Sequence, residues 1–352
     1  MLKPIDRQIL RSWHELKIEP RLARLTGRKL RKTGPRIAVI GNCQCYGLAY
    51  AIKILRPEAA VDHYPVLLRA RANMRILAQT LSTYDFVLSN DFQPGFVPGG
   101  GYPELRALLE KTMLVPQIVF NAFHPDCIYV SREDGSPVFS PLGPYHSALA
   151  LFAFLKGLKV EEAHALFNEN VFEALGYLDA WGPAAEETLR QCKAAGDLDL
   201  SKEFLKWSRR GVFMYTINHP KPFVLLDIAR HLLTKLGLET EEFDSEHYMI
   251  DDFVEQIRPI YPVYPPIAAR YGVLGSYLFR ITKAHPARDT GDYLTLSQFL
   301  TGAYENYAKC RRSSLLCNPR VDAWLADPAV SEELAALARE NLRAGRISTF
   351  VD

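Results

Sequence analysis

The 352-residue sequence predicts an α/β fold built on a mostly parallel sheet. Short apolar runs bounded by turn residues indicate strands, and patterns with apolar residues three and four positions apart indicate helices between them. Strands that alternate with helices are typical of a parallel sheet with helices on both faces. A hydrophobic content of 48% with 23% charged residues is that of a soluble globular protein.

The opening strand–turn–helix unit, residues 35–56, organises the rest of the chain. The apolar run Ile37–Ile40 predicts a strand, Gly41-Asn42 a tight turn, and the spacing of Leu48, Ile52 and Leu55 a helix. Cys43 lies in that turn, where the amides and dipole of the new helix favour an anion. A thiol there loses its proton more easily, which predicts a reactive cysteine. The alternative is a buried, inert thiol, and we expect Cys45 to be such a packing residue.

Further strands and helices follow in order. We expect four more strands, over residues 60–66, 85–90, 117–123 and 212–217. Residues 146–210 are almost entirely helical in pattern, which predicts a helical insertion before the last core strand. Helices are also expected near the C-terminus, over 293–308 and 331–344. The predicted division is a basic N-terminal arm (1–34), an α/β catalytic domain (35–260) and a C-terminal helical extension (261–352).

The N-terminal arm is strongly basic. Residues 1–36 hold 11 Lys or Arg against 3 Asp or Glu, whereas the remainder is net acidic. Ile5, Ile9, Trp13 and Leu16 share a helical face, and the helix is expected to be interrupted at Pro20. Two explanations account for this pattern. The helix is solvated and lies across the domain, or it binds an anionic partner, such as a membrane surface or a phosphate-rich ligand.

Other classes of protein are disfavoured by the sequence. The sequence contains no run of eighteen apolar residues, so no membrane span is expected, and the N-terminus lacks a secretory signal. Six cysteines in this length are no disulfide framework, so the expected compartment is the cytoplasm, with peripheral contact at the inner membrane surface through the arm. No metal site is predicted, because Cys-x-Cys alone is a weak zinc signal. Neither a glycine-rich nucleotide motif nor a nucleic-acid-binding pattern is present.

Polar and titratable residues follow four of the apolar strands, where ligands of parallel sheets bind. His219 and His124 are the candidate bases, Asp126 would orient an imidazole, and Asn90 and Asn42 would donate hydrogen bonds to an oxyanion. Each of these has a plainer interpretation as a loop or turn residue. The residues expected to bind a cofactor are Asn42, Gln44, Tyr145, His146, Asn218 and Lys221.

Two further motifs contain residue types that bind ligands or catalyse reactions. Tyr145-His146-Ser147 opens an apolar helix, where Ser147 either caps the helix or helps to hold a phosphate. Asp244 and His247 are three residues apart, a spacing that also occurs by chance.

Four short motifs resemble the WcbI family of capsular polysaccharide biosynthesis proteins. They are GNCQ at 41–44, FHPD at 123–126, YHS at 145–147 and NHP at 218–220, and the resemblance extends over residues 35 to 260. It implies an SGNH/GDSL-like three-layer α/β/α fold in which Cys43 stands where those hydrolases carry serine. It places Asn90 near an oxyanion position. The late Asp-x-x-His of those hydrolases would correspond either to Asp244–His247 or to His219.

The activity implied by the resemblance is transfer of an acetyl group from coenzyme A to a sugar hydroxyl of a surface polysaccharide. His219 or His124 would deprotonate the thiol or the acceptor, and the basic arm and Lys221 would meet the phosphates of coenzyme A. Two alternatives remain: an esterase or deacetylase that uses water, and a non-enzymatic scaffold for polysaccharide assembly at the inner membrane surface.

Overall fold

The computed structural model describes residues 2–346, apart from 27–33, 68, 133–134, 241, 256–257, 282–291 and 317. The chain divides into two compact units. Unit 1 comprises Met1–Ile118, Glu187–Arg209 and His219–Asp251, and unit 2 comprises Val119–Glu186, Arg210–Asn218 and Asp252–Asp352. The division falls within helix α9 (Trp181–Gly196). The predicted three-part domain division has different boundaries and stays a prediction.

Unit 1 is built on a parallel four-stranded sheet in the order β2-β1-β3-β4. Its strands are β1 (Arg36–Gly41), β2 (Ala60–Pro65), β3 (Phe86–Ser89) and β4 (Thr112–Leu114). The predicted α/β class with a parallel sheet is therefore confirmed. The chain adds β2 on one side of β1 and then crosses over to add β3 on the other. The carboxyl ends of β1 and β3 thus form the topological switch point, where open α/β sheets bind ligands.

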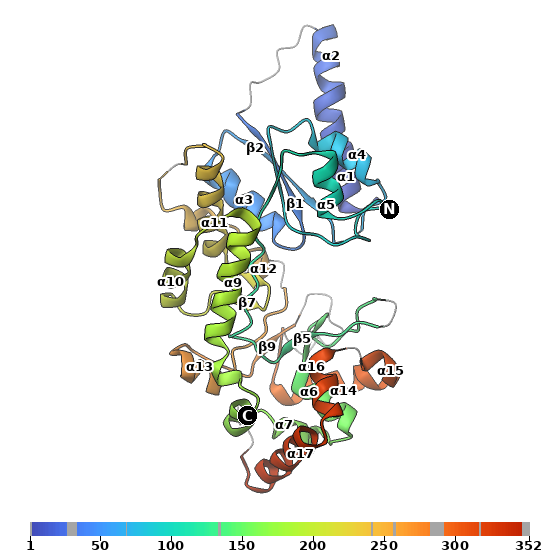
Figure 1. Cartoon of the computed structure of the whole chain (residues 1–352), viewed down its shortest axis with the longest axis vertical. Helices are drawn as coiled ribbons and strands as arrows, with labels where there is room; N and C mark the ends of the chain where they lie inside the picture. The colour runs from blue at the N-terminus through green and yellow to red at the C-terminus, as the bar shows by residue number, and fades with distance from the viewer. Residues whose placement is uncertain are drawn as a thin grey trace. The chain divides into compact units, whose positions relative to one another are not determined.

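Helices cover both faces of this sheet (Figure 1). Ala38 and Ile40 of β1 belong to a buried core that also contains residues of α1 (Pro4–Trp13), α4 (Met74–Leu81) and α5 (Tyr102–Leu108). Ile37 and Val39 alternate with them, point to the opposite face and are fully buried. Helices α3 (Cys45–Leu55) and α11 (Pro222–Lys235) belong to that second layer. Burial on both faces explains the unbroken apolar run of β1.

Three of the four segments predicted as strands after β1 contain a strand, and one does not. The segments 60–66 and 85–90 contain β2 and β3. No strand is assigned over 117–123, because the fourth strand is β4 and Pro116, which has no N–H, cannot extend a hydrogen-bonded ladder. The segment 212–217 contains β7 (Met214–Thr216), but this strand is not one of the four in the parallel sheet.

The described part of the N-terminal arm is one continuous helical run. It consists of α1, a π-helical turn η1 (His14–Ile18) and α2 (Glu19–Thr26). The predicted interruption at Pro20 is wrong. The wider π turn, closed by the hydrogen bond from Glu19 N to His14 O, changes the hydrogen-bond register just before the proline, so the chain remains helical. Residues 27–33, which the predicted arm includes, lie outside the described residues.

Helices make up most of unit 2. Those of the predicted helical segment 146–210 are α6 (Ala148–Lys156), α7 (Val160–His164), α8 (Glu169–Ala174) and α9, together with α10 (Ser201–Arg209), which belongs to unit 1. The predicted C-terminal helices are confirmed as α14 (Leu296–Ala308) and α17 (Pro328–Arg343). Other elements of unit 2 are η2 (Tyr177–Asp179), α12 (Asp252–Glu255), α13 (Pro265–Tyr271), β9 (Phe279–Arg280), β10 (Tyr293–Leu294), α15 (Arg312–Leu315) and α16 (Pro319–Ala326).

An antiparallel pair, β5 (Cys127–Tyr129) and β6 (Tyr145–Ser147), brings two of the sequence motifs of unit 2 together. Cys127 lies opposite Ser147, and Ile128 lies opposite His146. Helix α6 begins directly after β6, and Ser147 Oγ accepts a hydrogen bond from Ala150 N at 3.0 Å. The capping role considered for Ser147 is therefore the one that the structure has.

Candidate functional site

The turn after β1 is shaped by Asn42. Its backbone oxygen accepts a hydrogen bond from Cys45 N at 3.2 Å, and its side-chain Oδ1 accepts one from Gln44 N at 3.3 Å. Cys43 Sγ lies 4.0 Å from the same Oδ1. These bonds explain why asparagine stands here, because a short side-chain acceptor closes a turn that leads into a helix. These bonds hold the Cys43 thiol at the carboxyl end of β1, at the switch point.

The two cysteines of this turn differ in exposure. Cys43 is half-buried, whereas Cys45, the first residue of α3, is only 1% exposed. Burial raises the pKa of the Cys45 thiol to about 12, so this thiol stays protonated and unreactive. No disulfide joins the five described cysteines. The burial of Cys45 agrees with its predicted role as a packing residue, and the reactivity of Cys43 stays a prediction.

Side-chain amides, rather than a backbone ladder, attach the segment after β4 to this turn. Asn42 Nδ2 donates to Gln117 Oε1. Gln44 binds the backbone of Ile118 twice, from Nε2 to the carbonyl at 2.8 Å and from the Ile118 N–H to Oε1 at 3.1 Å. Gln44 thus uses both ends of its amide internally, and its cofactor-binding role stays a prediction. The sequence analysis missed Gln117, and only its position just after β4 and Pro116 would have indicated it.

Asn90, at the end of β3, is also committed to that segment. Its side chain is 1% exposed, and Nδ2 donates to the carbonyls of Val115 and Pro116, each at 3.3 Å. Oδ1 lies so close to Gly41 that a Cβ atom there would approach it to 2.1 Å, so only glycine fits. In this geometry both amide hydrogens are directed at carbonyl groups, and donation to an oxyanion stays a prediction.

Helices α3 and α11 pack in parallel, with their N-termini at the same end of unit 1. In their first turns, a Cβ atom at Gly47 would meet Leu225 Cδ1 at 2.5 Å, so the Leu225 side chain packs directly against the backbone of α3. At their other ends, Arg56 Nη1 donates to Glu239 O at 3.0 Å. Contacts at both ends fix the parallel orientation. The positive ends of two helix dipoles therefore converge, which favours an anionic group.

This convergence brings three predicted site residues to one end of unit 1. Cys43 precedes α3 by two residues. Lys221 is the N-cap residue of α11, and His219 lies two residues before it, in the short strand β8 (His219–Pro220). All three side chains are half-buried, so they combine a fixed position with partial access to solvent. A thiol, an imidazole and an ammonium group beside two helix N-termini are suited to acyl transfer from an anionic donor.

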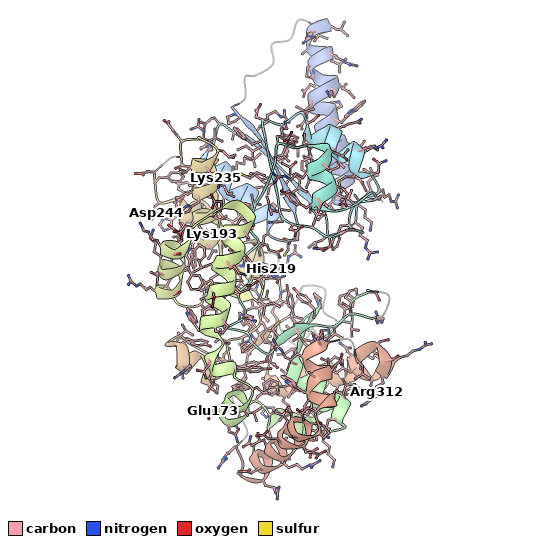
Figure 2. The ribbon with its side chains drawn as sticks, viewed as in Figure 1. Glu173, Lys193, His219, Lys235, Asp244 and Arg312 are labelled. Carbon is pink, nitrogen blue, oxygen red and sulfur yellow. The ribbon has the colours of Figure 1, made fainter. Side chains whose placement is uncertain are left out.

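The Asp244–His247 pair lies elsewhere. His247 Nδ1 is 3.5 Å from Asp244 Oδ2, but the side chains are 80% and 71% exposed, respectively. The turn that holds them, η3 (Ser245–Tyr248), is bonded through Ser245 Oγ to Arg230, in the second half of α11. Figure 2 shows Asp244 apart from His219. Of the two histidines that the hydrolase resemblance leaves open, His219 is the one at the end of unit 1 that holds Cys43.

Asp126 in unit 2 has a different environment. It is fully buried, and its carboxylate accepts hydrogen bonds from Leu149 N at 2.9 Å and from the hydroxyl groups of Tyr177, Tyr261 and Tyr264 at 3.3, 3.0 and 2.8 Å. Burial raises the pKa of each of these tyrosines well above its usual value, so each remains a protonated donor. Asp126 thus fixes the start of α6 to the aromatic core of unit 2. Its role in orienting an imidazole stays a prediction.

His146 is likewise built into unit 2. Burial lowers its pKa to about 4, so the ring is neutral at pH 7. Because a carbonyl only accepts, Nε2 carries the proton and donates to Val138 O at 3.0 Å, and Nδ1 accepts from Tyr307 Oη at 3.0 Å. Both ring nitrogens are therefore engaged inside the protein, and the predicted contact of His146 with a cofactor stays a prediction.

The remaining candidates of unit 2 pack against one another or against aromatic rings. Tyr145 Oη and Thr216 Oγ1 both donate to Asn218 Oδ1 at 3.2 Å. His124 is 2% exposed, with its ring 5.9 Å from that of Tyr261. The structure thus places His124, Asp126, Tyr145, His146 and Asn218 in unit 2, and Asn42, Cys43, Gln44, Asn90, His219 and Lys221 in unit 1.

The described part of the chain contains no group of three or more His, Cys, Asp or Glu arranged to hold a metal ion. No helix in it is long and apolar enough to cross a membrane.

A doubly wound α/β unit with a cysteine at the switch point defines the class of the protein, and comparison with known proteins defines its family. The sequence profile described as "Polysaccharide biosynthesis enzyme WcbI" matches residues 36–241, more than half of the chain, and the chain belongs to this family. No protein with a curated description matches the sequence.

A solved structure of WcbI has a similar fold, with a TM-score of 0.66 and 15% sequence identity. The match covers 86% of this chain and 99% of that one. That structure is described as a novel polysaccharide biosynthesis enzyme, in its native form without a disulfide bond between coenzyme A and one of its cysteines.

Proposed function

We propose that this protein transfers an acetyl group from coenzyme A to a sugar hydroxyl during the biosynthesis of a capsular or other surface polysaccharide. The observation that carries the proposal is the accessible thiol of Cys43 at the switch point, with His219 and Lys221 at the same end of unit 1. Membership of the WcbI family supports the polysaccharide pathway. The description of the WcbI structure names coenzyme A and one of its cysteines, without a disulfide bond between them, and this supports coenzyme A as the carrier of the donor.

The proposed reaction has two steps. The Cys43 thiolate attacks the thioester carbonyl of acetyl-coenzyme A, a new C–S bond forms, and coenzyme A leaves as a thiolate that takes up the proton lost by Cys43. The sugar hydroxyl then attacks the acetyl group on Cys43 while His219 accepts the hydroxyl proton. The C–S bond to Cys43 breaks, and the proton returns to the sulfur, which regenerates the enzyme.

The surroundings of the turn support this assignment of roles. The N-termini of α3 and α11 and the Lys221 ammonium group would bind phosphate groups of coenzyme A. Backbone amides at the start of α3 would stabilise the tetrahedral oxyanion, and Asn42 and Gln44 would hold those amides in place. In this proposal the buried residues His124, Asp126, Tyr145 and His146, together with the half-buried Asn218, support the fold of unit 2.

The strand order and the position of Cys43 after β1 support an SGNH-like interpretation of the fold, with cysteine in place of serine. We assign the reaction to the cytoplasm, where acetyl-coenzyme A is available. The absence of a membrane-spanning helix in the described residues agrees with this assignment.

Thermal unfolding with coenzyme A and acetyl-coenzyme A tests the proposal. A ligand present at about a hundred times its dissociation constant adds about 2.7 kcal/mol to the free energy of unfolding, which shifts the midpoint visibly. We expect such a shift for the wild type and for the matched control Cys45→Ala. A Lys221→Ala variant should show a smaller shift.

The outcomes separate the competing functions. No shift at millimolar coenzyme A, together with hydrolysis of acetyl esters, would identify a hydrolase, which has no use for this ligand. No shift and no hydrolysis would favour a scaffold without catalytic activity.

A further inference from the structure

The inner face of helix α1 fixes the N-terminal arm to unit 1. Ile5 and Ile9 are buried in the core beside the sheet. The Asp6 carboxylate accepts hydrogen bonds from the backbone N–H groups of Arg71 and Ala72, at 3.0 and 2.9 Å from Oδ1. The arm is therefore attached to unit 1 through the buried residues of α1, and its remaining side chains form the outer face.

The outer face of the arm carries large apolar side chains in water. Leu10 and Trp13 are 54% and 53% exposed, and Leu22 and Leu25 are 50% and 83% exposed. Each pair is three residues apart, so its members are neighbours on the helix surface. Helix α2 extends beyond the other helices of unit 1 (Figure 1). Apolar side chains gathered on one exposed element indicate a binding surface rather than a core face.

Basic side chains are interleaved with these apolar ones. The exposed basic residues of the described arm are Lys3, Arg7, Arg11, Lys17, Arg21 and Arg24. Among the described residues, only Arg11 of this set has an ion pair, with Glu15 at 2.8 Å. The acidic residues of the arm are Asp6, which caps backbone amides, Glu15 and Glu19. Six positive against three negative charges leave a net charge of +3.

We propose that the N-terminal arm docks on an anionic phospholipid bilayer, with α2 lying in the headgroup region. Lysine and arginine would contact the lipid phosphates, while Trp13 and the leucines would enter the boundary with the acyl chains. A small soluble anion would leave these apolar side chains in water. A second copy of the arm would bring like charges together. The bilayer is the partner that matches both the charge and the apolar side chains.

This interaction is independent of the proposed acetyl transfer, because no residue of the arm belongs to the candidate site. Its test is co-sedimentation of the full chain with vesicles of phosphatidylcholine and phosphatidylglycerol, against vesicles of phosphatidylcholine alone. We expect binding to the anionic vesicles that is lost at about 1 M salt, where the Debye length falls to about 3 Å. Weak or absent binding to the neutral vesicles is expected.

Two variants separate the charge from the apolar contribution. Lys17→Gln/Arg21→Gln/Arg24→Gln should weaken binding to anionic vesicles by about fivefold for each charge removed. Trp13→Ser should weaken binding at low salt as well, because it removes apolar contact without changing charge. Circular dichroism should show the helical content of the wild type in both variants, since every side chain changed is exposed.

The matched controls change exposed residues of unit 2. Lys309→Gln/Arg311→Gln/Arg343→Gln removes three positive charges, and Leu274→Ser removes a side chain that is 95% exposed. Both controls should bind as the wild type does. Equal binding to neutral and anionic vesicles, or unchanged binding of the arm variants, would overturn the proposal. A larger species in solution without vesicles that is lost in Trp13→Ser would assign the arm to a contact between copies instead.

Discussion

Unit 1 and unit 2 each contain a cluster of residues of the types that catalyse reactions, but the two clusters differ in what their polar atoms do. In unit 1, Cys43, His219 and Lys221 are half-buried beside two helix N-termini. In unit 2, Asp126 and His146 are fully buried, and their polar atoms are bonded to tyrosines and backbone groups. Histidine occurs in both clusters, and partial access to solvent distinguishes the unit 1 cluster, to which we assign the proposed reaction, from the buried cluster of unit 2.

The largest expected effect is on the accessible thiol. Cys43→Ala should lower the rate of acetyl transfer by about 10³-fold or more, because it removes the acyl carrier. The measurement is release of the coenzyme A thiol in the presence of candidate sugar acceptors. Cys45→Ala, two residues along, should keep most of the activity. Full activity of the Cys43 variant would remove the covalent step from the mechanism.

The next effect is on the stability of unit 2. Asp126→Asn should lower the free energy of unfolding by about 3 kcal/mol, because an amide has one acceptor oxygen, whereas the carboxylate has two, which together accept hydrogen bonds from four donors. Urea denaturation measures this change. The control Asp179→Asn alters a carboxylate that is 77% exposed and paired with Arg270, and should change stability by less than about 1 kcal/mol. A small effect for Asp126 would mean that the cluster is not structural.

Much of the fold was predictable from local pattern. The apolar run of β1, the turn at Asn42 and the periodicity of α3 identified the central strand–turn–helix unit correctly. The strand predicted over 117–123 failed because QIVFNAF has the composition of a strand, while the preceding Pro116 prevents pairing with the sheet. Similarly, the π turn that carries the helix through Pro20 depends on hydrogen-bond register, which residue propensity does not reveal.

The candidate site was only partly predictable. The sequence indicated Cys43 from its position in the turn after a strand, and His219 and Lys221 from their positions after the predicted strand 212–217. It did not separate them from Asp126 and His146, because burial depends on residues distant in the chain, such as Tyr264 and Tyr307. Nor did it identify Gln117, whose role rests on one contact with Asn42 across 75 residues.

The pH dependence of stability sharpens the comparison further. The pKa of His146 is about 4 in the folded protein, below its ordinary value of 6.5. Its contribution to stability is therefore complete above about pH 6.5 and is lost as the pH falls towards 4, because the unfolded chain takes up the proton first. Between pH 7 and pH 5, the wild type should lose about 2 kcal/mol more stability than His146→Gln.

Urea midpoints at the two pH values measure this difference. The control His247→Gln removes an imidazole that is 80% exposed and should retain the pH dependence of the wild type. If His146→Gln also retained it, the ring would not be held neutral inside unit 2.

The smallest expected effect concerns the amide that holds the turn in unit 1. Gln117→Leu removes the acceptor of Asn42 Nδ2 and should lower kcat by about tenfold with little change in KM, because the turn around Cys43 loses its fixed orientation. Gln117→Glu keeps an acceptor oxygen and should restore most of kcat. Equal losses in both variants would show that the position is sensitive to any change rather than to this hydrogen bond.

Calorimetric titration of coenzyme A into the wild type and two variants, Lys221→Ala and His146→Gln, tests whether the coenzyme A site lies in unit 1. We expect Lys221→Ala to weaken binding by about tenfold, because a charged contact with phosphate is lost. We expect unchanged affinity for His146→Gln. Normal binding by the Lys221 variant and loss of binding by the folded His146 variant would instead assign the coenzyme A site to unit 2.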